Sequence, residues 1–185
     1  MSDSRIEPRF HRTVPIDDTL ERDVCTHCGF VSYQNPKIVV GSVVRTEGGI
    51  LLCKRAIEPR KGYWTLPAGY LEQHETPEDG ARREAMEEAC ASIVLSELLA
   101  VYTIARLSQV QLIYRSVLAG GYAAGPESMA VDVFRFEDIP RDEIAFPSVH
   151  WALDHDDYRQ RGGSGQPFSN PAGENGDARE SVKRT

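Results

Sequence analysis

The 185-residue sequence has no long apolar run, no cysteine framework and no excess of basic charge. Its longest uninterrupted apolar stretches are short, strand-sized runs such as Ile38–Val40, whereas a membrane-spanning helix needs about 20 apolar residues. The first residues lack the apolar core of a secretory signal peptide. Four cysteines, of which Cys53 and Cys90 are isolated, suit a reducing compartment better than a disulfide scaffold. We therefore expect a cytoplasmic protein that does not associate with membranes.

The charge balance is acidic, with 21 Lys and Arg against 28 Asp and Glu and a net charge of −7. Proteins that hold long nucleic acids carry a basic surface, so we expect no nucleic-acid partner. An acidic protein that binds phosphate groups needs a cation to offset the repulsion. The hydrophobic fraction of 41% is enough for a soluble, globular chain with a core.

Composition divides the chain into three regions. Residues 1–36 are polar and irregular, residues 37–160 carry strand and helix patterns, and residues 161–185 are rich in Gly and in polar and charged residues. The last region cannot bury enough apolar surface to offset its ordering entropy, which predicts a disordered tail.

The middle region alternates strands with two helices, which predicts an α/β sandwich with a mixed sheet. Thr76 and Pro77 predict the start of a helix that runs to about residue 89, and Pro147-Ser148 the start of another that runs to about residue 159. We expect strands at 37–44, 50–55, 97–105, 110–119 and 129–136.

The first helix carries a concentrated acidic face. Glu84, Glu87 and Glu88 stand at i, i+3 and i+4, so their carboxylates share one face. Such a cluster is unfavourable without a positive charge, and carboxylates are preferred ligands of Mg²⁺. Arg83 is placed to orient a neighbouring glutamate. Taken alone, the helix also fits an ordinary solvated surface with exposed ion pairs. The loop before it argues against that alternative.

The segment from 69 to 91 resembles the Nudix box: Gly, five residues, Glu, seven residues, Arg-Glu, an aliphatic, any residue, Glu-Glu, any residue, Gly, an aliphatic. The chain supplies Gly69, Glu75, Arg83-Glu84, Ala85, Glu87-Glu88 and Ala91 at those spacings, with Cys90 at the second glycine. Flanking motifs resemble the subgroup of plant plastid FAD and ADP-ribose pyrophosphatases and their bacterial relatives. They lie at 25–29, 33–37, 51–55, 64–72 and 125–128, within a similarity that covers residues 14–158.

The resemblance implies an α/β/α Nudix fold that hydrolyses a nucleoside diphosphate linked to another moiety, most readily FAD or ADP-ribose, with Mg²⁺ or Mn²⁺. It implies metal ligation by Glu84, Glu87, Glu88 and the Gly69 carbonyl, assisted by Arg83. Glu84 and Glu127 are the alternatives for the catalytic base. A nucleotide substrate would meet Arg55, Trp64 and Tyr70. Many relatives are homodimers, which extends to this chain as an expectation.

Three positions depart from the resembled pattern. We expect Cys90 to be a small buried residue, although a left-handed turn there costs a side chain about 1 to 2 kcal/mol. Ala130 stands where relatives often have a metal-binding or catalytic glutamate, and Asp132 and Glu127 are the two candidates to replace it. Only one Cys-x-x-Cys pair of the subgroup's zinc ribbon is present, Cys25 and Cys28, and the other would fall near residues 3–6.

The N-terminal segment is thus expected to be a zinc-ribbon remnant. Zn²⁺ binding is not expected, since structural zinc takes four N or S ligands and only His11 and His27 could supplement the cysteines. Two functions compete with pyrophosphate hydrolysis of FAD or ADP-ribose. One is a dNTP-sanitising pyrophosphohydrolase, and the other is a Nudix-fold sensor that binds a nucleotide without cleaving it.

Overall fold

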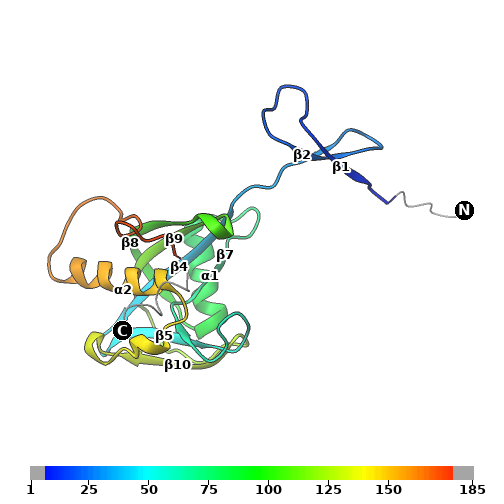
Figure 1. Cartoon of the computed structure of the whole chain (residues 1–185). Coiled ribbons are helices and arrows are strands. Elements are labelled where there is room, and N and C mark those ends of the chain that lie inside the picture. Colours follow the sequence, from blue (N-terminus) through cyan, green and yellow to red (C-terminus); the bar gives the residue numbers. More distant parts are fainter. Residues whose placement is uncertain (1–6, 177–185) are drawn as a thin grey trace, which may run out of the picture. The chain divides into compact units, whose positions relative to one another are not determined.

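A computed structural model describes residues 7–176 (Figure 1). The chain divides into two compact units, with the boundary between Asn35 and Pro36. None of the helices within residues 7–176 has the length and apolar composition of a membrane span.

The larger unit is built on a mixed sheet with the strand order β10-β5-β4-β9-β8 (Figure 1). The central strands β4 and β9 are parallel, and their neighbours pair antiparallel. Two short strands, β6 and β7, add to β5 and β4. The bounds are β4 Lys37–Thr46, β5 Gly49–Arg55, β6 Trp64–Thr65, β7 Ala68–Tyr70, β8 Ile93–Ile104, β9 Gln109–Leu118 and β10 Ser128–Phe134.

Two α-helices cover the sheet, α1 (Pro77–Ala89) and α2 (Pro147–Gln160). The start of α1 is as predicted, because the Thr76 hydroxyl accepts a hydrogen bond from the Asp79 amide at 3.1 Å. Three 3-10 turns, η1 (Ala105–Leu107), η2 (Phe136–Asp138) and η3 (Arg141–Glu143), lie in the connections.

The helices lie on opposite faces of the sheet, as the alternation of side chains along a strand shows. Val43 packs in one core cluster with residues of α2, whereas the adjacent Val44 packs in a second cluster with α1. Ala81, Ala85 and Ala89 are fully buried, so the small face of α1 lies close against the sheet as expected. This arrangement confirms the predicted α/β sandwich with a mixed sheet.

The five predicted strands of the middle region are all present, with ends that shift by a few residues. The largest shift is at β8, which begins at Ile93 rather than near residue 97. Register irregularities between Leu95 and Glu97 and between Leu98 and Ala100 disturb the alternation of this strand. The pattern from 93 to 96 is therefore weak in the sequence, although Ile93 is buried.

A buried carboxylate joins α2 to the sheet. Asp156 is fully buried and accepts from the Nε of Arg45 on β4 and the Nε of Arg115 on β9, each at 2.6 Å. Arg115 also donates to Glu97 on β8 at 3.1 Å. One acidic side chain of α2 thus ties the helix to two adjacent parallel strands.

Cys90 ends α1 in the left-handed conformation, with φ 46° and ψ 31°. Its amide donates to the Met86 carbonyl at 3.0 Å, which is the 5→1 bond of an αL cap, and the Ala91 amide donates to the Ala85 carbonyl at 3.1 Å. The expectation of a buried Cys90 is wrong, because its side chain is exposed. Cys90 thus adopts the left-handed backbone conformation that a glycine usually provides at this position.

Replacing Cys90 by Gly should therefore stabilise the chain by about 1 kcal/mol, because glycine adopts left-handed angles without a Cβ penalty. Urea unfolding of Cys90→Gly measures this change in the free energy of unfolding. Cys90→Ser is the control and should match the wild type, since it keeps a side chain of similar size. Equal stability of the Gly and Ser variants would contradict the argument.

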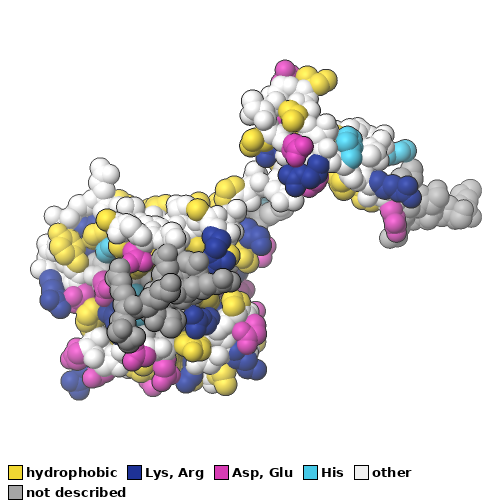
Figure 2. Space-filling view, in the orientation of Figure 1, with side chains coloured by type: hydrophobic (Ala, Val, Ile, Leu, Met, Phe, Trp, Pro, Cys, Tyr) yellow, Lys and Arg dark blue, Asp and Glu magenta, His cyan; other side chains and the backbone are white. Residues whose placement is uncertain are grey.

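The smaller unit is a three-stranded ribbon of β1 (Phe10–Thr13), β2 (Arg22–Cys25) and β3 (Val31–Ser32) in that order. Among the described residues of this unit, Cys25 is the only hydrophobic residue that is buried. Several apolar side chains are exposed instead, with Ile16 at 94%, and the ribbon shows scattered hydrophobic atoms in Figure 2. A unit with so small a core has little hydrophobic stabilisation of its own.

The composition of the segment after α2 predicts disorder, but residues 161–176 pack against β8 and α2 of the larger unit, to which they belong. Phe168 forms an isolated parallel bridge with Ala100 of β8 and stacks on His155 with ring centroids 4.0 Å apart. The remainder of the expected tail, residues 177–185, lies outside the described residues.

Candidate active site

Arg83 holds the loop before α1 against the acidic face of the helix. Its guanidinium donates to both oxygens of Glu75, at 2.6 and 3.1 Å, and to the Tyr70 carbonyl at 3.0 Å. It also donates to Glu84 at 2.7 Å and Glu87 at 3.0 Å. The expected pairing of Arg83 with a neighbouring glutamate is present. The pairing lowers the pKa of Glu75 and raises that of Arg83, so the Arg83–Glu75 pair is charged at neutral pH.

Glu84 and Glu88 are buried carboxylates, with side chains on the same face of α1. Burial raises the pKa of Glu84, partly offset by Arg83, and burial raises that of Glu88 to about 7. Glu88 accepts one hydrogen bond, from the Ala68 amide at 3.0 Å. The nearby charge of Glu127 raises the pKa of both groups further. A positive charge placed beside these two side chains would stabilise their ionised forms.

The burial of Glu88 predicts a pH-dependent stability. The pKa of Glu88 is about 7 in the folded chain against 4.5 for an ordinary glutamate. Burial of this group therefore does not lower the free energy of unfolding below pH 4.5, where the carboxyl is neutral in both states. The destabilisation grows as the pH rises and is complete above pH 7, where the carboxyl is ionised in both states. In EDTA, Glu88→Gln should be more stable than the wild type by about 3 kcal/mol at pH 8 and equal to it at pH 4.5.

Urea unfolding at several pH values measures the difference between the two proteins. Glu78→Gln, on the same helix but outside the cleft, is the matched control and should run parallel to the wild type. A constant difference between Glu88→Gln and the wild type across the pH range would contradict the raised pKa.

Gly69 on β7 packs directly against Glu84. A Cβ atom at this position would overlap the Glu84 carboxylate, so any other residue would displace that carboxylate. Glu87 differs from its neighbours, because its side chain is 58% exposed and forms an ion pair with Arg83 at 3.0 Å. Two buried carboxylates, Glu84 and Glu88, and the largely exposed Glu87 thus share one stretch of α1, with the Gly69 backbone against Glu84.

A cleft of about 900 Å³ opens beside this cluster, within the range that holds a nucleotide-sized ligand. Acidic, basic and apolar residues line it. Those singled out from the sequence are Arg55, Gly69, Tyr70, Arg83, Glu84, Glu87, Glu88 and Glu127. Arg60, which the sequence also offers as a phosphate contact, lines it as well, and the residues that the sequence did not indicate include Ile104, Gln109, Gln111, Phe146 and Gly176.

The three residues expected to bind substrate occupy different positions. Arg55 lines the cleft, donates to the Pro59 carbonyl at 2.8 Å and lies over the ring of Phe146 at 5.2 Å. Tyr70 is 48% exposed at the cleft, and its hydroxyl accepts a hydrogen bond from the side-chain amide of Gln109 at 3.2 Å. Trp64 is not among the lining residues; it is buried in the main core, edge-on to Phe134. The expected contact of Trp64 with substrate does not fit this position.

The region around Ala130 shows which acid faces the cleft. Ala130 packs against the main core cluster, and the Asp132 carboxylate accepts from the adjacent Val133 amide at 2.8 Å rather than lining the cleft. Glu127 does line the cleft. Among the described residues its carboxylate has no hydrogen-bond or ion-pair partner. Of the two expected substitutes for the missing glutamate, only Glu127 is in position.

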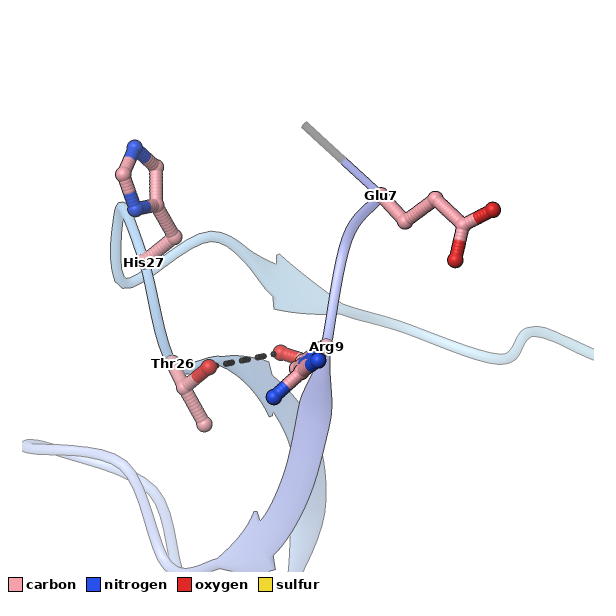
Figure 3. A pocket seen from close by; sticks show the side chains of 4 residues that line it. All are labelled: Glu7, Arg9, Thr26 and His27. Atoms are coloured by element: carbon pink, nitrogen blue, oxygen red, sulfur yellow. Dashed lines mark hydrogen bonds between the residues drawn. The ribbon is translucent and has the colours of Figure 1, made fainter. Parts of the chain in front are cut away.

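The two cysteines of the N-terminal ribbon form a knuckle in which the Gly29 amide donates to the Cys25 carbonyl at 2.9 Å. Hydrogen bonds from the Cys28 and His27 amides lower the pKa of the Cys25 thiol. A hollow of about 320 Å³ lies beside the knuckle, where Thr26 donates to the Arg9 carbonyl and Glu7 and His27 point apart (Figure 3). Residues 3–6, where a second cysteine pair would fall, lie outside the described part of the chain.

Residues 35–152 match the profile of the NUDIX domain. The chain belongs to the Nudix hydrolase family. Residues 8–34 match the Nudix N-terminal zinc-ribbon profile, so the small ribbon is a Nudix N-terminal domain.

Known relatives extend the comparison. The crystal structure of a NUDIX hydrolase from Nitrosomonas europaea is 40% identical, with a TM-score of 0.81, covering 90% of this Nudix chain and 94% of that one. A MutT-like protein of Streptomyces ambofaciens is 40% identical over 50% of this chain, but the match spans only 59% of that protein. An ADP-ribose pyrophosphatase of Methanocaldococcus jannaschii is 29% identical over 59% of this chain and 68% of its own length.

The acidic cluster of this Nudix chain fits a hard divalent cation in its chemistry. The donors are carboxylate and carbonyl oxygens, which Mg²⁺ and Mn²⁺ prefer, and burial leaves Glu84 and Glu88 with raised pKa values that a cation would lower. Within residues 7–176, no three Asp, Glu, His or Cys side chains are gathered closely enough to hold a metal ion. Arg83 instead supplies the positive charge beside Glu84 and Glu87.

Proposed function

We propose that this chain hydrolyses the diphosphate linkage of a nucleoside diphosphate joined to a second group, releasing a nucleoside monophosphate. The observation that carries the proposal is the pair of buried carboxylates, Glu84 and Glu88, in the wall of a nucleotide-sized cleft. Arg55 and Arg60 line the same cleft and offer positive charge to the phosphates.

Mg²⁺ or Mn²⁺ is the proposed cofactor, held by Glu84, Glu87, Glu88 and the Gly69 carbonyl. When bound, the cation supplies Lewis-acid stabilisation of the charge that develops on the diphosphate. Glu87 is exposed and free to turn toward the other two carboxylates. Arg83 would release Glu84 and Glu87 while its two hydrogen bonds to Glu75 keep it in place.

The attacking water needs a proton acceptor, and Glu84 and Glu127 both line the cleft. Glu127 has the more accessible carboxylate, because Arg83 already pairs with Glu84. Glu84→Gln and Glu127→Gln distinguish the two roles. Loss of the acceptor should lower kcat and remove the acidic limb of the pH–rate profile, whereas loss of a metal ligand should raise the Mg²⁺ concentration needed for half-maximal rate.

ADP-ribose and FAD are the proposed substrates. The similarity to an ADP-ribose pyrophosphatase supports the first, and a cleft of about 900 Å³ has room for the dinucleotide. The purified chain is assayed with ADP-ribose, FAD, NADH and dNTPs in Mg²⁺, in Mn²⁺ and in EDTA. Release of AMP from ADP-ribose or FAD, abolished by EDTA, is the expected result. Preference for a dNTP would instead identify a nucleotide-sanitising pyrophosphohydrolase.

A non-catalytic nucleotide sensor is the second candidate. Ala130, which packs against the core, and the absence of a gathered metal site within residues 7–176 favour it. A sensor would bind ADP-ribose in calorimetry but release no AMP in either metal, and the same substrate panel therefore separates the two functions.

A further inference from the structure

The chain after α2 folds back onto the sheet as a strap, defined here as residues 166–176. Arg159, near the end of α2, fixes its start by donating to the carbonyls of Gly165 and Gln166 at 2.8 and 2.9 Å. In Figure 1 the strap is the orange-red to red segment that runs beside β8. The turn before it is therefore tied to a buried side chain of the helix.

Phe168 attaches the strap to β8 through both its backbone and its ring. Its amide donates to the Leu99 carbonyl, and its carbonyl accepts from the Val101 amide, each at 2.8 Å. The ring is stacked on His155 at 4.0 Å, with Tyr158 edge-on. This one residue pairs as a strand does and fills an aromatic niche on α2.

Asn170 continues the attachment two residues later. Its side-chain amide donates to the Thr103 carbonyl at 2.8 Å, and its side-chain oxygen accepts from the Thr103 amide at 2.9 Å. The same amide nitrogen donates to the Glu174 carbonyl at 3.2 Å and so holds the following turn. Asn170 thereby directs the chain from β8 toward the cleft.

The strap reaches the substrate cleft at Gly176. Gly176 has φ +80°, and a Cβ on it would overlap the side chain of Ile104. Gly176, Ile104 and Leu107 all line the cleft that also contains Glu84 and Glu88. Gln109, from the start of β9, lines it as well. The end of the strap thus completes an apolar wall of the cleft, with the side-chain amide of Gln109 beside that wall.

We propose that this strap is a specificity-determining part of the substrate site. Its wall of Ile104, Leu107 and Gly176, with the Gln109 amide, suits a flat ring with a polar edge, as in a nucleobase or a flavin. The inference rests on the proposed function for its substrates, while the strap itself is held by contacts remote from the acidic cluster.

The test uses the full chain and two kinds of variant. Phe168→Ala/Asn170→Ala releases the strap, and loss of hydrogen-exchange protection at the Val101 and Thr103 amides reports the release. Gly176→Val keeps Phe168 and Asn170, and its side chain forces Gly176 and Ile104 apart, so it alters the wall directly. Ser169→Ala is the matched control, because its side chain is exposed between the two attachment residues.

Values of kcat and KM are measured for FAD, ADP-ribose, NADH and dATP. Both kinds of variant should change kcat/KM unequally, by tenfold or more between the most and least affected substrates, through KM and with kcat within about twofold. Gly176→Val should raise KM most for the bulkiest substrate. An equal change for every substrate, or no change with Gly176→Val, would overturn the proposal.

A failure of the proposed hydrolase function can be distinguished from a failure of the strap proposal. If the wild-type chain hydrolyses none of the four compounds, AMP binding is measured by calorimetry instead. A tenfold or greater weakening by Phe168→Ala/Asn170→Ala, absent in Ser169→Ala, would then still support the strap as part of a nucleotide site. Equal AMP affinity in the two variants would reject it.

Discussion

Replacing Glu88 by Gln should lower kcat for the preferred substrate by about 10² to 10³-fold, which is the usual effect of removing one fixed electrostatic group from an active site. Glu88 and Glu84 are buried to the same degree, but Glu84 pairs with Arg83 whereas the charge of Glu88 has no paired arginine among the described residues. Its negative charge is therefore available to a cation. Initial rates in saturating Mg²⁺ measure the loss.

The matched control is Glu78→Gln, which removes the same group from the same helix. Glu78 accepts from the Tyr114 hydroxyl at 3.1 Å and does not line the cleft, so its variant should keep the wild-type rate. Because Glu88→Gln should also be the more stable protein at pH 8, a slow and less stable variant would show that the substitution disrupts the fold instead of the chemistry.

Replacing Asp156 by Ala should destabilise the chain by about 3 to 5 kcal/mol, because it leaves two arginines at the surface of the core without their shared carboxylate. The side chains of Arg45 and Arg115 are only 22% and 19% exposed, so water replaces the lost partner poorly. Urea unfolding monitored by tryptophan fluorescence measures the effect, since Trp151 lies on the same helix.

Asp154→Ala is the control for this prediction. Asp154 lies on the same helix and pairs with Arg141 at 2.9 Å, but its side chain is 62% exposed. Exposed ion pairs contribute about 0 to 1 kcal/mol, so the two variants should differ by several kcal/mol. Since Asp→Ala raises helix propensity in both variants, similar losses for both would mean that the buried carboxylate adds no more stability than an exposed ion pair.

The parts of the fold set by local chemistry could be predicted from the sequence. Thr76 and Pro77 determine the start of α1 through a side-chain cap and a fixed φ angle, and both act within one turn. The box spacing likewise places Glu84 and Glu88 on one face. Neither required knowledge of distant partners.

The parts set by distant packing could not be predicted. Trp64 sits beside the cleft motif in the sequence, but its partner Phe134 is supplied by β10, so its burial is not visible locally. Phe168 is a single aromatic in a Gly-rich segment, and its niche is formed by α2 and β8. The low apolar content of 161–185 predicts disorder correctly only when no neighbouring surface receives such an anchor.

The position of the strap has a consequence for solubility. β8 is the outermost strand of its sheet, and a bare outer strand offers free amides and carbonyls to another molecule. Phe168 and Asn170 already occupy those groups at Leu99, Val101 and Thr103. The same few residues therefore guard the chain against intermolecular strand pairing, and a variant that releases them should aggregate at concentrations where the wild type stays dispersed.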